Sequence, residues 1–187
     1  MKLSEYQEII RPRLSDYRYR HSVNVAAQAR HLAELYGGDP QKAETAGILH
    51  DIMKDTDPQE QLRVMTEAGI ALSEVEQSSH KLWHAISGAA FVRTQLGITD
   101  EDILNAIRYH TTGRAGMSVL ERIVFIADFT SAEREFDGAD KLKKLVEKDL
   151  REAILAGLTF TIRDLAGRGK TIHPDAIAAY NDMLLHG

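Results

Sequence analysis

Apolar residues recur every three or four positions along most of this sequence, a spacing typical of helices that bury one face. The first long segment, from about residue 17 to 36, shows the pattern clearly. The residues on its single stripe are His21, Val25, Ala29, Leu32 and Tyr36. No stretch alternates apolar and polar residues in the way that predicts a β-strand. We therefore predict an all-α protein.

Capping and turn signals divide the chain into successive helices. Asp39-Pro40 and Asp57-Pro58 each combine a capping side chain with a proline suited to the first helical position. Ser73 with Glu76 has the spacing of a capping box, as does Ser118 with Glu121. The predicted helices cover about 17–36, 40–50, 58–69, 73–97, 99–110, 118–128 and 140–165, and a last helix opens at His173-Pro174.

Length and composition favour one globular domain. The 187 residues suffice for a single core, and the fractions of hydrophobic (43%) and charged (27%) residues are ordinary for a globular protein. We expect a motif-bearing core at about 17–136 with C-terminal helices at 140–187 packed on it. A net charge of -5 argues against nucleic acid as a partner. No signal peptide or membrane-length apolar run is visible, so we expect a cytoplasmic protein without membrane partners.

Six ionisable side chains lie on or beside the apolar stripes of different helices: His21, His50, Asp51, His84, His110 and Asp128. Burying such groups is costly unless they are paired or bind a metal ion. His50 and Asp51 are neighbours, about 100° apart around a helix, so at a helix end both can approach one cation. Because the chain has no cysteine, a metal site must use imidazole and carboxylate ligands. Such a set favours iron or manganese, with cobalt, nickel and zinc as alternatives.

The order of these residues resembles a known family. A His, a His-Asp pair 29 residues later and a distant Asp form the pattern of the HD phosphohydrolase superfamily. The segments RYRHSVNVA, AGILHDIMKD, AIRYHTTG and ADFTSAER further resemble its YqeK-type members. The resemblance covers about residues 17–136. It implies an HD-domain helical bundle that cleaves diadenosine tetraphosphate symmetrically into two ADP.

The resemblance also assigns roles within the cluster. His21, His50, Asp51 and Asp128 would hold a first metal ion, and His84 with His110 would hold a second, Asp51 bridging the two. A Lewis-acidic ion lowers the pKa of bound water and neutralises phosphoryl charge, so a hydroxide generated there would attack phosphorus. Asp51 and Lys54 are the predicted catalytic residues, because Lys54 lies three residues after Asp51 and can hold a phosphate or the leaving oxygen.

A polyphosphate substrate needs further donors near the metal ions. Arg18 precedes His21 by one helical turn, and Arg134 follows Asp128 by six residues. Guanidinium groups suit phosphate, and Arg134 is expected to fork onto one. The predicted substrate-binding residues are Arg18, Lys54, His80, Thr111 and Arg134.

Several alternatives remain open from the sequence. Within the superfamily, a nucleotidase or a nucleoside triphosphohydrolase would use the same ligands. A nucleotide-sensing module with little turnover is a different class, and Asp51→Ala would separate it from an enzyme. The amphipathic C-terminal segment suits either core packing or a homodimer interface. We expect His31 and His186 on the surface and His173 as a helix cap.

Overall fold

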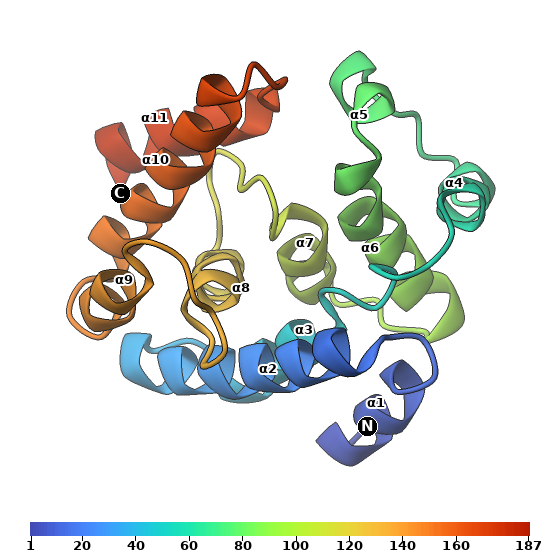
Figure 1. Cartoon of the computed structure of the whole chain (residues 1–187). Helices are drawn as coiled ribbons and strands as arrows, with labels where there is room; N and C mark the ends of the chain where they lie inside the picture. Colours follow the sequence, from blue (N-terminus) through green and yellow to red (C-terminus); the bar gives the residue numbers. More distant parts are fainter.

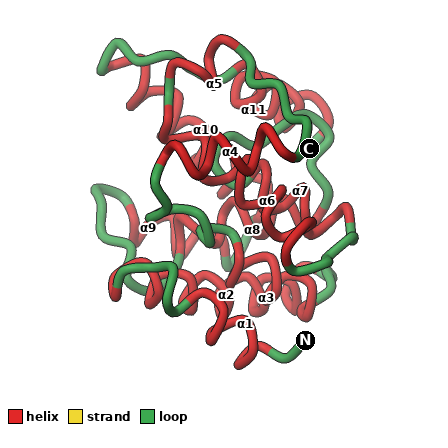
Figure 2. Tube along the Cα trace, turned by 90° about the vertical axis from the view of Figure 1, so that its right-hand side faces the viewer, coloured by secondary structure: helices red, strands yellow, loops and turns green.

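The computed structural model describes all 187 residues and contains helices and loops without any strand, as Figure 2 shows. This confirms the predicted all-α class. The helices, with one 3-10 turn (η1), are α1 (Leu3–Ile10), α2 (Asp16–Tyr36), α3 (Pro40–Leu49), α4 (Pro58–Glu67), α5 (Glu74–Ser78), η1 (His80–Leu82), α6 (Trp83–Gln95), α7 (Glu101–Tyr109), α8 (Val119–Thr130), α9 (Ala139–Val146), α10 (Leu150–Gly167) and α11 (Pro174–His186).

Most helix boundaries coincide with the expected signals. Gly37 ends α2 in the left-handed conformation, with a φ of 72° that favours glycine. The side chains of Asp39 and Asp57 accept amide hydrogen bonds at the starts of α3 and α4. Ser118 caps α8, and the imidazole of His173 caps α11 by accepting from an amide of the first turn. These local contacts satisfy amides that have no partner within the helix.

Two predicted helices are wrong in their extent. The capping box at Ser73 opens only the five-residue α5, and the helix that carries His84 begins separately at Trp83. The indole of Trp83 donates to the carbonyl of Glu76 at 2.7 Å, which fixes the turn between the two helices. Periodicity alone does not reveal this break, because buried residues continue on both sides of it.

The segment predicted as one helix over 140–165 is also two helices. It breaks between Val146 and Leu150, where the Asp149 side chain accepts from the amide of Glu152 and starts α10. The apolar spacing continues across the break because α9 and α10 both pack against α8. In addition, the unpredicted α1 packs against α3 through its buried face.

Helices α2, α3, α7 and α8 form the centre of the molecule. Helix α2 packs against α3 and α8, while α7 contacts α3, α6 and α8, an arrangement visible in Figure 1. The approach of α2 to α3 is close enough that a Cβ atom on Gly47 would lie 2.8 Å from the Cα of Ala26. This contact fixes His21 of α2 relative to His50, which follows α3.

One hydrophobic core of 37 buried residues extends from α1 to α11. Phe125 of α8 lies at its centre without solvent exposure, and Leu158 of α10 and Met183 of α11 belong to the same cluster. The C-terminal helices therefore share a core with the helices that carry the His and Asp residues. No helix combines the length and the hydropathy needed to span a bilayer.

Candidate metal centre

The six His and Asp side chains singled out in the sequence come together in the fold. His21 lies in α2 and Asp128 near the end of α8, whereas His50 and Asp51 directly follow α3. His84 lies in the first turn of α6, and His110 follows α7. Five of the six side chains are almost fully buried, and Asp128 is partly exposed. Tertiary packing thus gathers ionisable groups from five helices at one buried point.

Three of the histidines are oriented by backbone carbonyl groups close to them in sequence. The Nδ1 atoms of His50 and His110 lie 2.7 Å from the carbonyl oxygens of Gly47 and Ile107. His84 makes the same contact, at 2.8 Å, with the carbonyl of Lys81. A carbonyl oxygen can only accept, so each Nδ1 carries the proton and each neutral ring keeps its lone pair on Nε2. All three Nε2 atoms face the centre of the cluster.

His21 is oriented differently. It lies inside α2, and its Nδ1 donates to the carboxylate of Glu133, which lies beyond the end of α8. Asn24 donates to the other oxygen of Glu133 at 2.6 Å, and Ser131 donates to the first at 2.7 Å. Glu133 is not among the residues predicted from the sequence, because nothing in its local pattern connects it with a residue 112 positions away.

The donor set at one end of the cluster fits a bound cation. The Nε2 atoms of His84 and His110 are 3.2 Å apart, although both bear lone pairs. Asp51 Oδ1 lies 3.2 Å from the first and 3.6 Å from the second, is buried, and has no hydrogen-bond donor. Three acceptors packed together repel one another unless a cation lies among them. We call His84, His110 and Asp51 Oδ1 the His84 end.

The opposite end, which we call the His21 end, contains His21, His50, Asp128 and Asp51 Oδ2. His21 Nε2 lies 3.0 Å from Asp128 Oδ1 and 3.3 Å from His50 Nε2. The Arg134 guanidinium forms an ion pair with Asp128. Positive groups of the protein therefore already balance part of the negative charge at this end.

Burial controls the protonation of the inner histidines. Desolvation lowers the pKa of His50 to about 3 and that of His84 to about 4, so both rings are neutral near pH 7. Burial also acts to lower the pKa of His21, but hydrogen bonds to Asp128 and Glu133 outweigh it and raise that pKa. Neutral imidazole is the form that binds a metal ion.

The carboxyl groups are held in the ionised form. Burial acts to raise the pKa of Asp51, yet the adjacent imidazoles of His50, His110 and His84, together with the ammonium group of Lys54, keep it well below its ordinary value. The pKa of Asp128 is likewise low, because contacts with His21 and Arg134 outweigh its desolvation. The cluster thus offers carboxylates and neutral imidazoles together, a donor set suited to a divalent transition metal.

Three overlapping triplets have one ligand atom from each residue within 4.8 Å of the others. They are His21 with His50 and Asp51, His50 with His110 and Asp128, and Asp51 with His84 and His110. Because Asp51 belongs to the first and third triplets through different oxygens, it is placed between the two ends.

Predicted cationic residues surround the cluster. Lys54 Nζ lies 3.1 Å from His84 Nε2 and 3.7 Å from Asp51 Oδ1, and burial lowers its pKa. Arg18 Nη1 lies 3.3 Å from Asp51 Oδ2. Arg134 contacts the carboxylate of Asp128 and also donates to its backbone carbonyl at 2.7 Å. Its expected fork onto a phosphate is thus directed, in this structure, at a neighbouring carboxylate.

Two cavities adjoin the cluster. The first, of about 640 Å³, is lined by ten residues without any hydrophobic side chain, among them Arg18, Lys54, His80, Lys81 and His84. We call it the polar cavity. The second, of about 470 Å³, is lined by Tyr17, Asp128, Phe129, Glu133, Arg134, Glu135, Phe136 and Phe160. We call it the aromatic cavity.

The remaining predicted residues lie in different surroundings. His80 lines the polar cavity and packs its ring on Trp83 at 4.2 Å between centroids. Thr111 follows His110 but lines neither cavity adjoining the cluster. His31 is on the surface, as expected, where it pairs with Glu147 at 2.9 Å.

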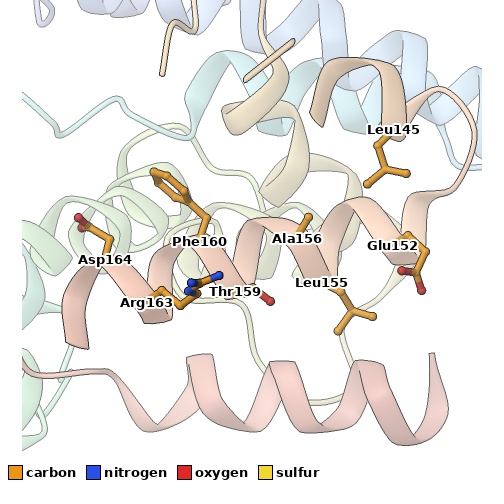
Figure 3. Close-up of a pocket in the computed structure, with 8 residues that line it drawn as sticks. All are labelled: Leu145, Glu152, Leu155, Ala156, Thr159, Phe160, Arg163 and Asp164. Atoms are coloured by element: carbon orange, nitrogen blue, oxygen red, sulfur yellow. The ribbon is translucent and has the colours of Figure 1, made fainter. Parts of the chain in front are cut away.

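Another groove lies along the C-terminal helices; it shares Phe160 with the aromatic cavity but includes none of the candidate metal ligands. Figure 3 shows its lining, in which Leu145 of α9 stands beside residues of α10 that include Leu155, Phe160 and Arg163. Its volume is about 740 Å³, but it contains no histidine and none of the clustered aspartates. The ligand chemistry described above is confined to the buried cluster and its two cavities.

Comparisons of sequence and of structure with known proteins both find similar proteins. Residues 18–133 match the HD domain family. A protein of Halalkalibacterium halodurans named "Bis(5'-nucleosyl)-tetraphosphatase, symmetrical" is 42% identical over 95% of both chains, and one of Bacillus subtilis with the same name is 37% identical over 97% of both. The crystal structure of a predicted HD superfamily hydrolase from Clostridium acetobutylicum superposes with a TM-score of 0.95 at 34% identity, covering 100% of this chain and 99% of the other.

Proposed function

Because the chain belongs to the HD domain family, we propose that it is a metal-dependent hydrolase that cleaves dinucleoside tetraphosphates symmetrically into two nucleoside diphosphates. The observation that carries this proposal is the convergence of His84 and His110 on Asp51 Oδ1, a buried carboxylate oxygen that has no hydrogen-bond donor. A metal-dependent reaction explains why such acceptors are buried together. The names of relatives that align over nearly the whole chain support the dinucleotide substrate.

The residues available would hold one or two ions. His21, His50, Asp128 and Asp51 Oδ2 are the proposed ligands at one end, and His84, His110 and Asp51 Oδ1 are those at the other. A bound ion supplies Lewis acidity, which lowers the pKa of water and neutralises phosphoryl charge. Mixed imidazole and carboxylate ligands favour iron or manganese. Metal analysis of the purified protein tests this identity.

The surrounding cations would bind and orient the tetraphosphate. Lys54 and Arg18 lie between the polar cavity and Asp51, so a phosphoryl group beside Asp51 would contact both. Their charges offset the negative charge of the phosphate chain, and their fixed positions would hold its central anhydride bond at the cluster. Attack by water on one central phosphorus then breaks its bond to the bridging oxygen, which leaves with the second nucleoside diphosphate.

The ionised carboxylates and the neutral histidines have a separate role. Because burial keeps His50 and His84 neutral near pH 7, these rings need not lose a proton before they bind a cation. Asp51, between the two ends, would keep them at a fixed separation. The protein thus supplies a rigid, largely dehydrated ligand set before substrate arrives.

Product analysis tests the proposed reaction. Metal-loaded protein is incubated with diadenosine tetraphosphate, ATP and a deoxynucleoside monophosphate in separate reactions, and the products are separated by chromatography. We expect ADP as the sole product from diadenosine tetraphosphate and little turnover of the other two. A chelator-treated sample serves as the control. AMP together with ATP would contradict symmetric cleavage, and faster turnover of the monophosphate would indicate a nucleotidase.

A further inference from the structure

The aromatic cavity differs in chemistry from every other surface at the cluster. Three of the chain's five phenylalanines, Phe129, Phe136 and Phe160, line it together with Tyr17. Tyr17 and Phe160 keep 48% and 43% of their surface exposed, respectively. Large aromatic side chains grouped and exposed beside a site commonly mark a binding surface.

The aromatic side chains form an open-sided group. Phe129 and Phe160 are 6.4 Å apart between ring centroids and nearly perpendicular, and Phe136 lies 5.0 Å from Phe160. Phe129 also contacts Phe125 of the core, which anchors the group on α8. Phe160 comes from α10, so the C-terminal helices contribute directly to this cavity. Because Phe160 and Tyr17 are the most exposed members of the group, a planar ring entering from solvent would meet these two first.

The aromatic cavity directly adjoins the His21 end of the cluster. Asp128 and Arg134 line it, and both contact His21 Nε2, at 3.0 and 3.4 Å. The Tyr17 ring is parallel to the His21 ring, with 6.5 Å between centroids. A ligand with its phosphates at the cluster would therefore extend its nucleoside into the aromatic cavity.

The two cavities differ in the charged side chains that line them. The aromatic cavity is lined by three carboxylates, Asp128, Glu133 and Glu135, against the single guanidinium of Arg134, so it disfavours phosphate. The polar cavity instead carries three cations, Arg18, Lys54 and Lys81, against the two carboxylates of Asp55 and Asp57, a balance that suits phosphate better. An uncharged aromatic group fits the first and a phosphate chain fits the second.

We propose that the aromatic cavity is a nucleobase subsite, in which one base of the dinucleotide stacks on Phe160 and Tyr17. The inference rests on the proposed function for its substrate class. The phosphates on the far side of the cleaved bond lie toward the polar cavity. The two halves of a symmetric substrate are thus held by unlike contacts, one through its base and the other through its phosphates.

Equilibrium binding tests the subsite independently of turnover. Isothermal titration calorimetry is performed with ADP and, separately, with pyrophosphate on metal-loaded wild-type protein and the variants Phe160→Leu and Phe160→Tyr. Base stacking on one aromatic ring changes affinity by about tenfold or more. We expect Phe160→Leu to weaken ADP binding by about that factor, Phe160→Tyr to preserve it, and both to leave pyrophosphate binding unchanged.

A matched control is Leu62→Ala on α4, because Leu62 is also 43% exposed but lines neither cavity. It should bind ADP as the wild type does. Tyr17→Ala provides a second test on a different helix and should also weaken ADP selectively. Wild-type affinity for ADP in both Phe160→Leu and Tyr17→Ala would overturn the subsite, as would an equal loss of pyrophosphate binding.

The same proteins distinguish failure of the subsite from failure of the proposed function. If the wild type produces ADP from diadenosine tetraphosphate and Phe160→Leu keeps its KM, the hydrolase proposal stands and the subsite is wrong. If the wild type does not cleave this substrate but binds ADP through Phe160, the subsite stands and the reaction is wrong.

Discussion

The His84 end and the His21 end of the cluster use the same kinds of ligand but are stabilised in different ways. At the His84 end, each imidazole is fixed by a carbonyl three residues earlier, and no donor satisfies Asp51 Oδ1. At the His21 end, the carbonyl of Gly47 fixes His50 in the same way, but His21 takes its orientation from Glu133, and Arg134 balances the charge of Asp128. The first end is set by local backbone geometry, whereas the second also depends on side chains brought from far along the chain.

This difference indicates which end most needs a cation. Unlike the His84 end, the His21 end has a guanidinium and a histidine of raised pKa to offset its carboxylates. Lys54 is the one cation within 4 Å of Asp51 Oδ1 at the His84 end, and burial lowers its pKa. The family resemblance assigns His84 and His110 to the second of two metal ions. In the structure, these two histidines lie at the end where fewer groups of the protein offset the carboxylate charge.

The largest expected effect comes from removing the residue that the two ends share. Asp51→Ala should reduce hydrolysis at least ~1,000-fold and remove bound metal from both ends, because each end loses one carboxylate oxygen. Metal content by mass spectrometry and product formation measure the two losses. Asp140→Ala, an exposed aspartate in α9, is the matched control and should leave both unchanged. Unchanged hydrolysis in Asp51→Ala would remove the metal mechanism.

Removing both histidines of one end tests whether there are two ions. The double variant His84→Ala/His110→Ala should hold one metal ion per chain where the wild type holds two, and should lose about 100-fold in rate. Metal-to-protein ratio is the direct measurement. A wild-type protein with only one ion, bound equally well by the double variant, would show that the His84 end is not a metal site.

Changing the side chain that orients His21 should have a moderate effect. Loss of a carboxylate that accepts a hydrogen bond from the other ring nitrogen of a metal-bound imidazole typically reduces metal affinity or activity 10- to 100-fold. We expect such a loss in Glu133→Gln, with Glu133→Asp partly restoring affinity. The surface pair His31–Glu147 offers a matched control, Glu147→Gln, which removes a similar contact where no metal is expected. Equal metal affinity in Glu133→Gln and Glu147→Gln would contradict the positioning role.

The smallest expected effect is on the stability of the metal-free protein, where individual histidines of the cluster should respond to pH in opposite directions. His50 and His84 have folded pKa values of about 3 and 4, below the unfolded value of 6.5, so the unfolded state takes up protons first on acidification. Their contribution to stability is lost as pH falls below about 6.5. His21 has a raised pKa, so its contribution is present below 6.5 and lost as pH rises through the folded pKa.

Urea unfolding in the presence of a chelator measures this effect at pH 7 and pH 5. Each buried neutral histidine should contribute about 2 kcal/mol of the loss in unfolding free energy between these values. His84→Gln, which cannot take up a proton, should remove its share of the loss. An identical pH dependence in wild type and His84→Gln would contradict the assignment.

The helical class, most helix starts and the identity of the clustered residues could all be predicted from the sequence. Helix signals are local, as in the capping by Asp39 and Asp57, and a polar residue on an apolar stripe can be recognised without knowledge of its neighbours. His50 and His110 were also placed by local signals, because a histidine after the last helical turn reaches a nearby carbonyl. Helical periodicity could not locate the break before Leu150, since it continues through both helices.

The surroundings of those residues follow from helix packing and could not be predicted from the sequence. His21 lies within a helix and takes its partner from Glu133, a contact set by the packing of α2 on α8 rather than by any spacing. The aromatic cavity likewise depends on Phe160 of α10 lying beside Phe129 of α8. Sequence patterns record which face of a helix is buried, but not which face of another helix meets it. The ligands could therefore be predicted one by one, while their orientation and the chemistry of the adjoining cavities required the fold.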